Sequence, residues 1–108
     1  MNLPSEIKFA DEKVKKSFED LEKEDPSLFK IITQAFYNMR ENAFCGIQIP
    51  KKQIPKEYKQ KYGTENLWKY DLPKGWRLMY TIRRDEILIF SIILEWLDHK
   101  DYNKRFNY

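Results

Sequence analysis

The chain has 108 residues, which is enough for one compact domain and too few for two domains that each fold around a core of their own. Hydrophobic residues make up 42% of it and charged residues 34%, a balance that argues against a disordered chain. The net charge of +3 is uneven, because residues 51–84 carry 10 Lys and Arg against 3 Asp and Glu. Two interpretations of this basic segment stay open: a surface for phosphate or an acidic partner, and lysines that keep the protein dissolved.

Several classes of protein do not fit the sequence. Its first residues contain no apolar core of signal-peptide length, and the longest apolar run, residues 87–94, is too short to span a bilayer. The single cysteine, Cys45, rules out an internal disulfide and a cysteine-based zinc site, and there is no glycine-rich phosphate loop. We therefore expect a cytoplasmic protein with no membrane partner, no metal and no cofactor.

The first half of the chain predicts a short strand followed by two helices. Residues 6–10 have the pattern of a strand, and Asp11 is suitably located to cap the helix that follows. Asp25 and Pro26 mark the start of a second helix, which continues along one apolar stripe to about Asn42. The tight link between the two helices predicts that they pack antiparallel.

The second half predicts a short helix between Pro55 and Gly63, then three strands, then a last helix. The links between the strands have turn-forming residues, which predicts an antiparallel meander. The three strands are residues 67–72, 76–82 and 87–96. Asp98 is expected to cap the last helix, residues 99–106. The expected fold class is α+β, a single domain over residues 1–108 in which an antiparallel sheet meander packs against an N-terminal helical hairpin, with a short C-terminal helix.

The middle strand carries an arginine among apolar residues. Its alternating sets are Trp76, Leu78, Tyr80 and Ile82 on one face and Arg77, Met79, Thr81 and Arg83 on the other. We expect the first set to face the helices and the second, beginning with Arg77, to be exposed. A mid-strand arginine is most often a solvent-facing residue paired with a cross-strand carboxylate. The functional interpretation is that the planar guanidinium of Arg77 binds a phosphate group.

His99, the single histidine, directly follows the last predicted strand, and Tyr102 lies one helical turn farther on. A lone histidine at a strand end is more often a structural hydrogen bonder, although imidazole is also the side chain that ordinarily titrates near neutral pH. If Arg77, His99 and Tyr102 converge on one edge of the sheet, they form a set suited to cleaving a phosphodiester.

Three segments of the chain resemble the RelE/ParE superfamily of toxins from type II toxin–antitoxin modules. "IKFADEKVKKSFEDL" resembles the opening strand and first helix of that family, and "LWKYDLPKGWRLMYTI" its strand hairpin with an aromatic-Arg-Leu-x-Tyr segment. "IILEWLDHKDYNKRF" resembles its last strand and terminal His-x-x-Tyr segment. The resemblance extends over nearly the whole chain and implies a RelE-like fold of the microbial-ribonuclease type.

The RelE branch would act as a metal-independent endoribonuclease that cuts messenger RNA on the ribosome. By this resemblance the ribose 2′-hydroxyl attacks the adjacent phosphate, Arg77 stabilises the charge that develops on the phosphate oxygens, and His99 or Tyr102 moves protons. The resemblance does not rank those two as acid and base. The residues expected to hold the RNA backbone are Lys51, Lys52, Lys69, Lys74 and Arg83.

The resemblance also implies a protein partner, a small cognate antitoxin that covers the basic sheet face or displaces the terminal helix. Operator DNA would be reached only through that antitoxin. Where strongly active members carry paired basic residues on the first hairpin strand, this chain has Lys69 alone with Asp71 close by. The alternative is therefore a protein without nuclease activity, either a ParE-like gyrase inhibitor or an inactive toxin-like module that binds antitoxin.

Overall fold

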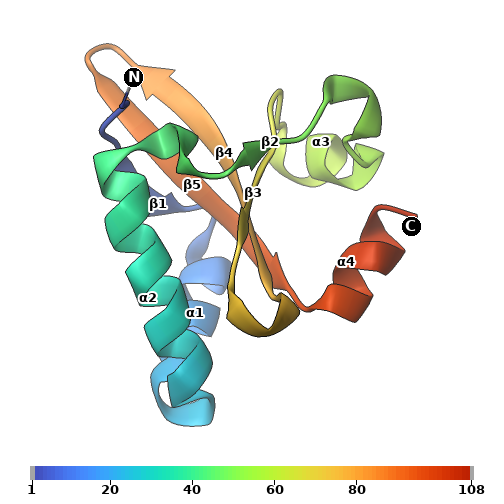
Figure 1. Cartoon of the computed structure of the whole chain (residues 1–108). Coiled ribbons are helices and arrows are strands. Elements are labelled where there is room, and N and C mark those ends of the chain that lie inside the picture. The colour runs from blue at the N-terminus through green and yellow to red at the C-terminus, as the bar shows by residue number, and fades with distance from the viewer. Residues whose placement is uncertain (1, 108) are drawn as a thin grey trace.

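The computed structural model describes residues 2–107 as an α+β fold built on a five-stranded sheet of order β1-β5-β4-β3-β2. Figure 1 shows α1 and α2 on one face of this sheet and α3 and α4 on the other. The strands are β1 (Glu6–Phe9), β2 (Ile47–Gln48), β3 (Trp68–Asp71), β4 (Arg77–Asp85) and β5 (Leu88–Leu97). The helices are α1 (Glu12–Glu24), α2 (Pro26–Glu41), α3 (Lys56–Tyr62) and α4 (His99–Arg105), with short 3-10 turns η1 (Ala43–Cys45), η2 (Lys51–Gln53) and η3 (Pro73–Gly75).

The helices begin where their capping residues predict. The side chain of Asp11 accepts a hydrogen bond from the Val14 amide at 2.8 Å, and that of Asp25 accepts one from the Leu28 amide at 3.1 Å. Asp98 caps α4 in the same way. All three predicted caps are thus confirmed. None of the helices within residues 2–107 is both long enough and apolar enough to cross a bilayer.

The predicted meander is confirmed, but it is only part of a mixed sheet. Strand β4 pairs antiparallel with both β3 and β5, whereas β1 pairs with β5 in parallel, with Glu6 opposite Phe90. Strand β2 adds the opposite edge. The parallel strand β1 was not part of the predicted meander, because the pattern of a strand does not reveal which partner it will pair with or in which direction.

The hairpin between β4 and β5 is longer than the sequence predicts. The charged run "RRDE" is expected to be a connection, yet Arg83, Arg84 and Asp85 all belong to β4 and pair with the start of β5. The turn is made instead at Glu86, which has a φ of 52°, and Ile87, which is exposed. Because this end of the hairpin is exposed, its strand can carry charged side chains without burying them.

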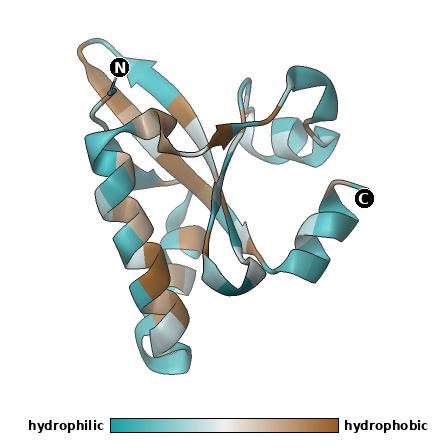
Figure 2. Ribbon diagram, viewed as in Figure 1, coloured by the Kyte–Doolittle hydropathy of each residue, from teal (hydrophilic) through white to brown (hydrophobic). Residues whose placement is uncertain are grey.

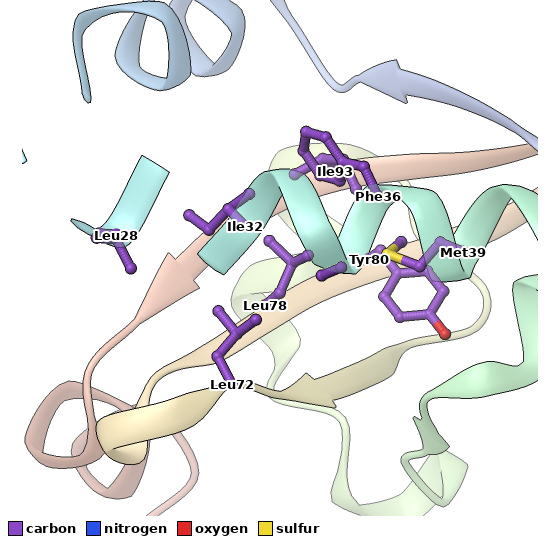
Figure 3. Close-up of a cluster of buried hydrophobic side chains, with 9 residues drawn as sticks. Leu28, Ile32, Phe36, Met39, Leu72, Leu78, Tyr80 and Ile93 are labelled. Carbon is purple, nitrogen blue, oxygen red and sulfur yellow. The ribbon is translucent and has the colours of Figure 1, made fainter. Parts of the chain in front are cut away.

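A first hydrophobic core lies between the helical hairpin and the sheet. Figure 3 shows buried side chains of α2 against Leu78, Tyr80 and Ile93 from the strands and against Leu72, which follows β3. The Tyr80 hydroxyl donates to the Ala43 carbonyl at 2.8 Å and accepts from the Gly46 amide at 3.0 Å, so its polar atom is satisfied inside the core. The prediction that Leu78 and Tyr80 face the helices is confirmed.

The opposite face of the sheet is also covered, which corrects the expectation that it would be exposed. Met79 is fully buried and Thr81 is buried beside it. They belong to a face against which α3 and α4 pack through Tyr58 and Tyr102. The second core comprises Ile49, Tyr58, Leu67, Met79, Leu94, Leu97, Tyr102 and Phe106. Strand alternation identifies residues that share a face but does not say whether a helix packs on that face.

The central strand fits this double coverage. Figure 2 shows β5 as a largely hydrophobic band through the middle of the molecule. Its residue Ile93 lies in the first core, and Leu94 and Leu97 lie in the second. The nearly continuous apolar run of β5 is thus explained by burial on both of its faces.

Met79→Ala tests whether the sheet face that α3 and α4 cover is buried in the folded protein. Because Met79 is fully buried in the second core, the truncation should lower the free energy of unfolding by about 2–5 kcal/mol. Arg83→Ala is the control, since Arg83 is an exposed residue of the same strand. Urea unfolding followed by circular dichroism measures both. Equal stability of the two variants would contradict the second core.

Candidate functional site

Arg77 lies at the start of β4, directly opposite Asp71 of β3 and Leu97 of β5. Its side chain is only 19% exposed, so the expectation of an exposed arginine was wrong. Helix α4 covers it, and the guanidinium carbon lies 5.2 Å from the centre of the Tyr102 ring. A cation over an aromatic face is attracted by the negative charge density of the ring. The strand therefore directs Arg77 toward α4 rather than into open solvent.

The guanidinium of Arg77 is held from two sides. Its Nη1 atom donates to the Gly75 carbonyl at 2.8 Å, so the turn before β4 fixes the orientation of the side chain. Its Nε atom lies 3.0 Å from Oδ1 of Asp71. Nε is buried and makes no hydrogen bond, so this contact is an ion pair without a directed N–H bond. The cross-strand carboxylate that typically partners a strand arginine is thus present.

Lys69 completes a cluster that we call the hairpin charge cluster, defined as Lys69, Asp71 and Arg77. The Lys69 Nζ atom lies 3.4 Å from the same Oδ1 atom of Asp71 and 5.4 Å from the centre of the Tyr102 ring. Lys69 and Asp71 share a face because they are two residues apart on one strand. The cluster contains two cations and one carboxylate, and the Tyr102 ring lies against both cations.

His99 lies beside this cluster at the start of α4. Its side chain is exposed, and its Nε2 atom lies 3.2 Å from Nδ2 of Asn103 on the next helical turn. Gly75 approaches it so closely that a methyl group there would lie 3.2 Å from Cβ of His99. The Gly75 carbonyl also accepts the hydrogen bond from Arg77. Gly75 therefore contacts both Arg77 and His99.

Tyr102 joins the same region but is almost fully buried. It is 3% exposed and stacks on Phe106 with ring centres 4.5 Å apart. Its ring belongs to the second core and supports the cations of Lys69 and Arg77. The structure therefore brings Arg77, His99 and Tyr102 to one end of the sheet, with His99 exposed and Tyr102 inside.

The other predicted RNA-binding residues are exposed and spread over the surface. Lys74 lies at the tip of the turn before β4 with a φ of 63°. Arg83 is six residues from Arg77 along β4, a separation of about 20 Å. Lys51 and Lys52 lie in η2, and Lys52 lines a hollow in front of α3 and the end of α4. Of these four residues, only Lys74 lies next to the Arg77 site, in the turn whose Gly75 carbonyl binds the guanidinium.

A second ion pair lies on the same face of the sheet, and no sequence pattern predicted it. Arg105 of α4 donates from Nη1 to Oε2 of Glu95 at 2.6 Å, and its guanidinium carbon lies 5.6 Å from the centre of the Tyr58 ring. A register shift between Met79 and Tyr80 brings Glu95 opposite Met79, on the face that α4 covers. Burial, and next the Glu95 carboxylate, raise the pKa of the Tyr58 hydroxyl far above its ordinary value.

Comparisons with known proteins give no match. No protein-family model matches this chain, and neither does any curated protein or solved structure. Within residues 2–107, no three His, Cys, Asp or Glu side chains gather as a metal site would require. The site therefore offers only the chemistry of its own side chains, which are the cations of Lys69 and Arg77, the carboxylate of Asp71 and the exposed imidazole of His99.

The raised tyrosine pKa predicts a loss of stability at alkaline pH. Above about pH 10 the tyrosines of the unfolded chain release protons, whereas Tyr58 and Tyr80, whose pKa values burial raises, keep theirs in the folded state. The unfolded state then binds fewer protons, so the free energy of unfolding falls by up to about 1.4 kcal/mol per pH unit for each such tyrosine. Below pH 10 this loss is absent.

Denaturant unfolding at a series of pH values measures this slope. Tyr58→Phe should reduce it, because the variant has no hydroxyl to titrate at that position. Tyr37→Phe is the matched control, since Tyr37 is 58% exposed. If Tyr58→Phe and the wild type lose stability at the same rate above pH 10, Tyr58 is not protected in the folded state.

Proposed function

We propose that this chain is a RelE-like toxin of a type II toxin–antitoxin module, an endoribonuclease that cuts messenger RNA on the ribosome. The observation that carries the proposal is the meeting of Arg77 and Lys69 with Tyr102 beside the exposed His99 at one end of the sheet. These are groups that can bind a phosphodiester and move a proton. The resemblance of the sequence motifs to the RelE/ParE superfamily supports the proposal, because it implies catalytic roles for Arg77, His99 and Tyr102 and an RNA-binding role for Lys69.

The reaction needs no metal. The ribose 2′-hydroxyl attacks the neighbouring phosphorus, the bond to the 5′-oxygen breaks, and a cyclic phosphate and a 5′-hydroxyl are formed. Arg77 stabilises the negative charge that develops on the phosphate oxygens, because its guanidinium is already fixed by the Gly75 carbonyl. His99 is the exposed group that exchanges a proton with the substrate, either from the attacking hydroxyl or to the leaving oxygen.

Tyr102 has a different role in this mechanism from the one that the resemblance implies. At 3% exposed, it is poorly placed to reach a ribose directly. Its ring lies against both Lys69 and Arg77, so it holds these cations in position. We assign Tyr102 as a positioning residue and His99 as the group that moves the proton.

The partners of the protein follow from its charge. The ribosome presents the messenger RNA, and exposed basic residues such as Lys51, Lys52, Lys74 and Arg83 bind its backbone. The cognate antitoxin is a small protein with an acidic amphipathic segment, which complements the 10 Lys and Arg against 3 Asp and Glu in residues 51–84. It inhibits by binding over the basic surface or by displacing α4. Operator DNA is bound only through the antitoxin.

One observation favours the alternative without nuclease activity. Asp71 pairs with both cations of the hairpin charge cluster, at 3.4 Å from Lys69 and 3.0 Å from Arg77. A carboxylate at this position weakens the attraction of the two cations for a substrate phosphate. A ParE-like gyrase inhibitor, or an inactive toxin-like module that binds antitoxin, does not need that attraction.

Induced expression of the wild type, Arg77→Ala and His99→Ala tests the proposed function. Mapping transcript ends on translating ribosomes measures cleavage. Wild type should cut transcripts. In each variant the cleavage rate should fall by about 10²- to 10³-fold, because Arg77→Ala lacks charge stabilisation and His99→Ala lacks proton transfer. Arg84→Ala is the control, because Arg84 is an exposed arginine toward the far end of β4.

The other outcomes separate the hypotheses. Growth arrest with intact transcripts contradicts the ribonuclease, and DNA damage together with intact transcripts identifies gyrase as the target. If both alanine variants cut as fast as wild type, the ribonuclease stands and the assignment of its site is wrong. Thermal unfolding of each purified variant separates lost catalysis from lost folding.

A further inference from the structure

We propose that the carboxylate of Asp71 occupies the position of the substrate phosphate in the hairpin charge cluster and leaves that position when RNA binds. This inference rests on the proposed function, since it concerns the phosphodiester at the same site. It assigns to Asp71 a role that neither the sequence motifs nor the proposed mechanism contains. Asp71 acts as an internal competitor that sets how tightly the site binds RNA.

The geometry is that of an anion held by two cations. A single oxygen of Asp71, Oδ1, contacts both the Lys69 ammonium and the Arg77 guanidinium. Both cations also lie against the Tyr102 ring, with Nζ of Lys69 5.4 Å and the guanidinium carbon of Arg77 5.2 Å from its centre. Phosphate oxygens bind to arginine and lysine through the same N–H groups as carboxylate oxygens. A phosphodiester can therefore replace the carboxylate without rebuilding the site.

The Nε–H donor of Arg77 is left unsatisfied in the cluster. It is buried and has no hydrogen-bond partner, although the Asp71 oxygen is only 3.0 Å away. The Nη1 atom of the same guanidinium is engaged by the Gly75 carbonyl at 2.8 Å, which holds the group in place. Asp71 thus neutralises the Arg77 charge without satisfying its Nε–H donor. A phosphate oxygen in better alignment would make the bond that the carboxylate does not.

The burial of the three side chains indicates which one moves. Asp71 has 48% of its side chain exposed, against 20% for Lys69 and 19% for Arg77. The carboxylate is thus the outermost member and can turn into water, where it is readily solvated. The cations are held by the ring and by the turn. The exchange also conserves charge, since one negative carboxylate is replaced by one negative phosphodiester.

Direct binding to a short fluorescein-labelled single-stranded RNA tests this inference. Asp71→Asn should bind the RNA roughly two- to fivefold more tightly than wild type at low salt, because the ion pairs of the half-exposed carboxylate no longer have to be broken. The gain should shrink as salt is raised, since added ions screen the charges. Asp71→Glu keeps the charge and should bind as wild type does.

Two controls isolate the effect. Asp85→Asn makes the same change of charge at an exposed residue about 26 Å along β4 from Arg77, and it should give a much smaller gain. A methylphosphonate oligonucleotide, whose backbone is uncharged, should give no gain with Asp71→Asn.

In the wild type, the NMR signal of the Arg77 Nε–H group should shift as RNA is added. This measurement does not depend on any variant folding correctly.

The inference is overturned if Asp71→Asn gains no more than Asp85→Asn, if Asp71→Glu gains as much as Asp71→Asn, or if the gain persists on the uncharged probe. An Arg77 Nε–H signal that stays unchanged at saturating RNA overturns it as well. Transcript cleavage is measured separately. If Asp71→Asn shows the expected gain while wild type leaves transcripts intact on ribosomes, the ribonuclease proposal fails and the competition by Asp71 stands.

Discussion

The packing of α4 against the sheet is the contact on which the candidate site depends. Tyr102 and Phe106 enter the second core with their rings stacked, and Leu97 ends β5 directly beside them. Apolar burial and ring stacking hold the helix. Because the Tyr102 ring also lies against Lys69 and Arg77, the contact that stabilises the fold positions both cations. Stability and the geometry of the charges are therefore coupled at this point.

The hairpin charge cluster joins two requirements that oppose each other. In the protein without a ligand, Asp71 offsets the repulsion between Lys69 and Arg77, whose charges approach the same oxygen atom. For the binding of an anion, the same carboxylate is a competitor. Functional sites commonly sacrifice part of a local optimum in this way. Under the proposal that Asp71 leaves when RNA binds, the cluster exchanges one anion for another.

Much of the fold could be predicted because its signals are local. Asp11, Asp25 and Asp98 cap helices through hydrogen bonds to amides three residues away, so each cap is visible within one turn of sequence. Strand alternation correctly separated Leu78 and Tyr80 from Met79. The parallel pairing of β1 with β5 was not predictable in this way, because it joins segments from opposite ends of the chain.

The sequence by itself determined the capped helices, the meander, the two faces of β4 and the concentration of positive charge in residues 51–84. Only the tertiary structure decided that the second face is covered, that Asp71 pairs with both Lys69 and Arg77, and that the Tyr102 ring supports these cations. The reason is one of range. Caps and alternation arise from backbone geometry over a few residues, whereas burial and charge pairing depend on which distant segments meet.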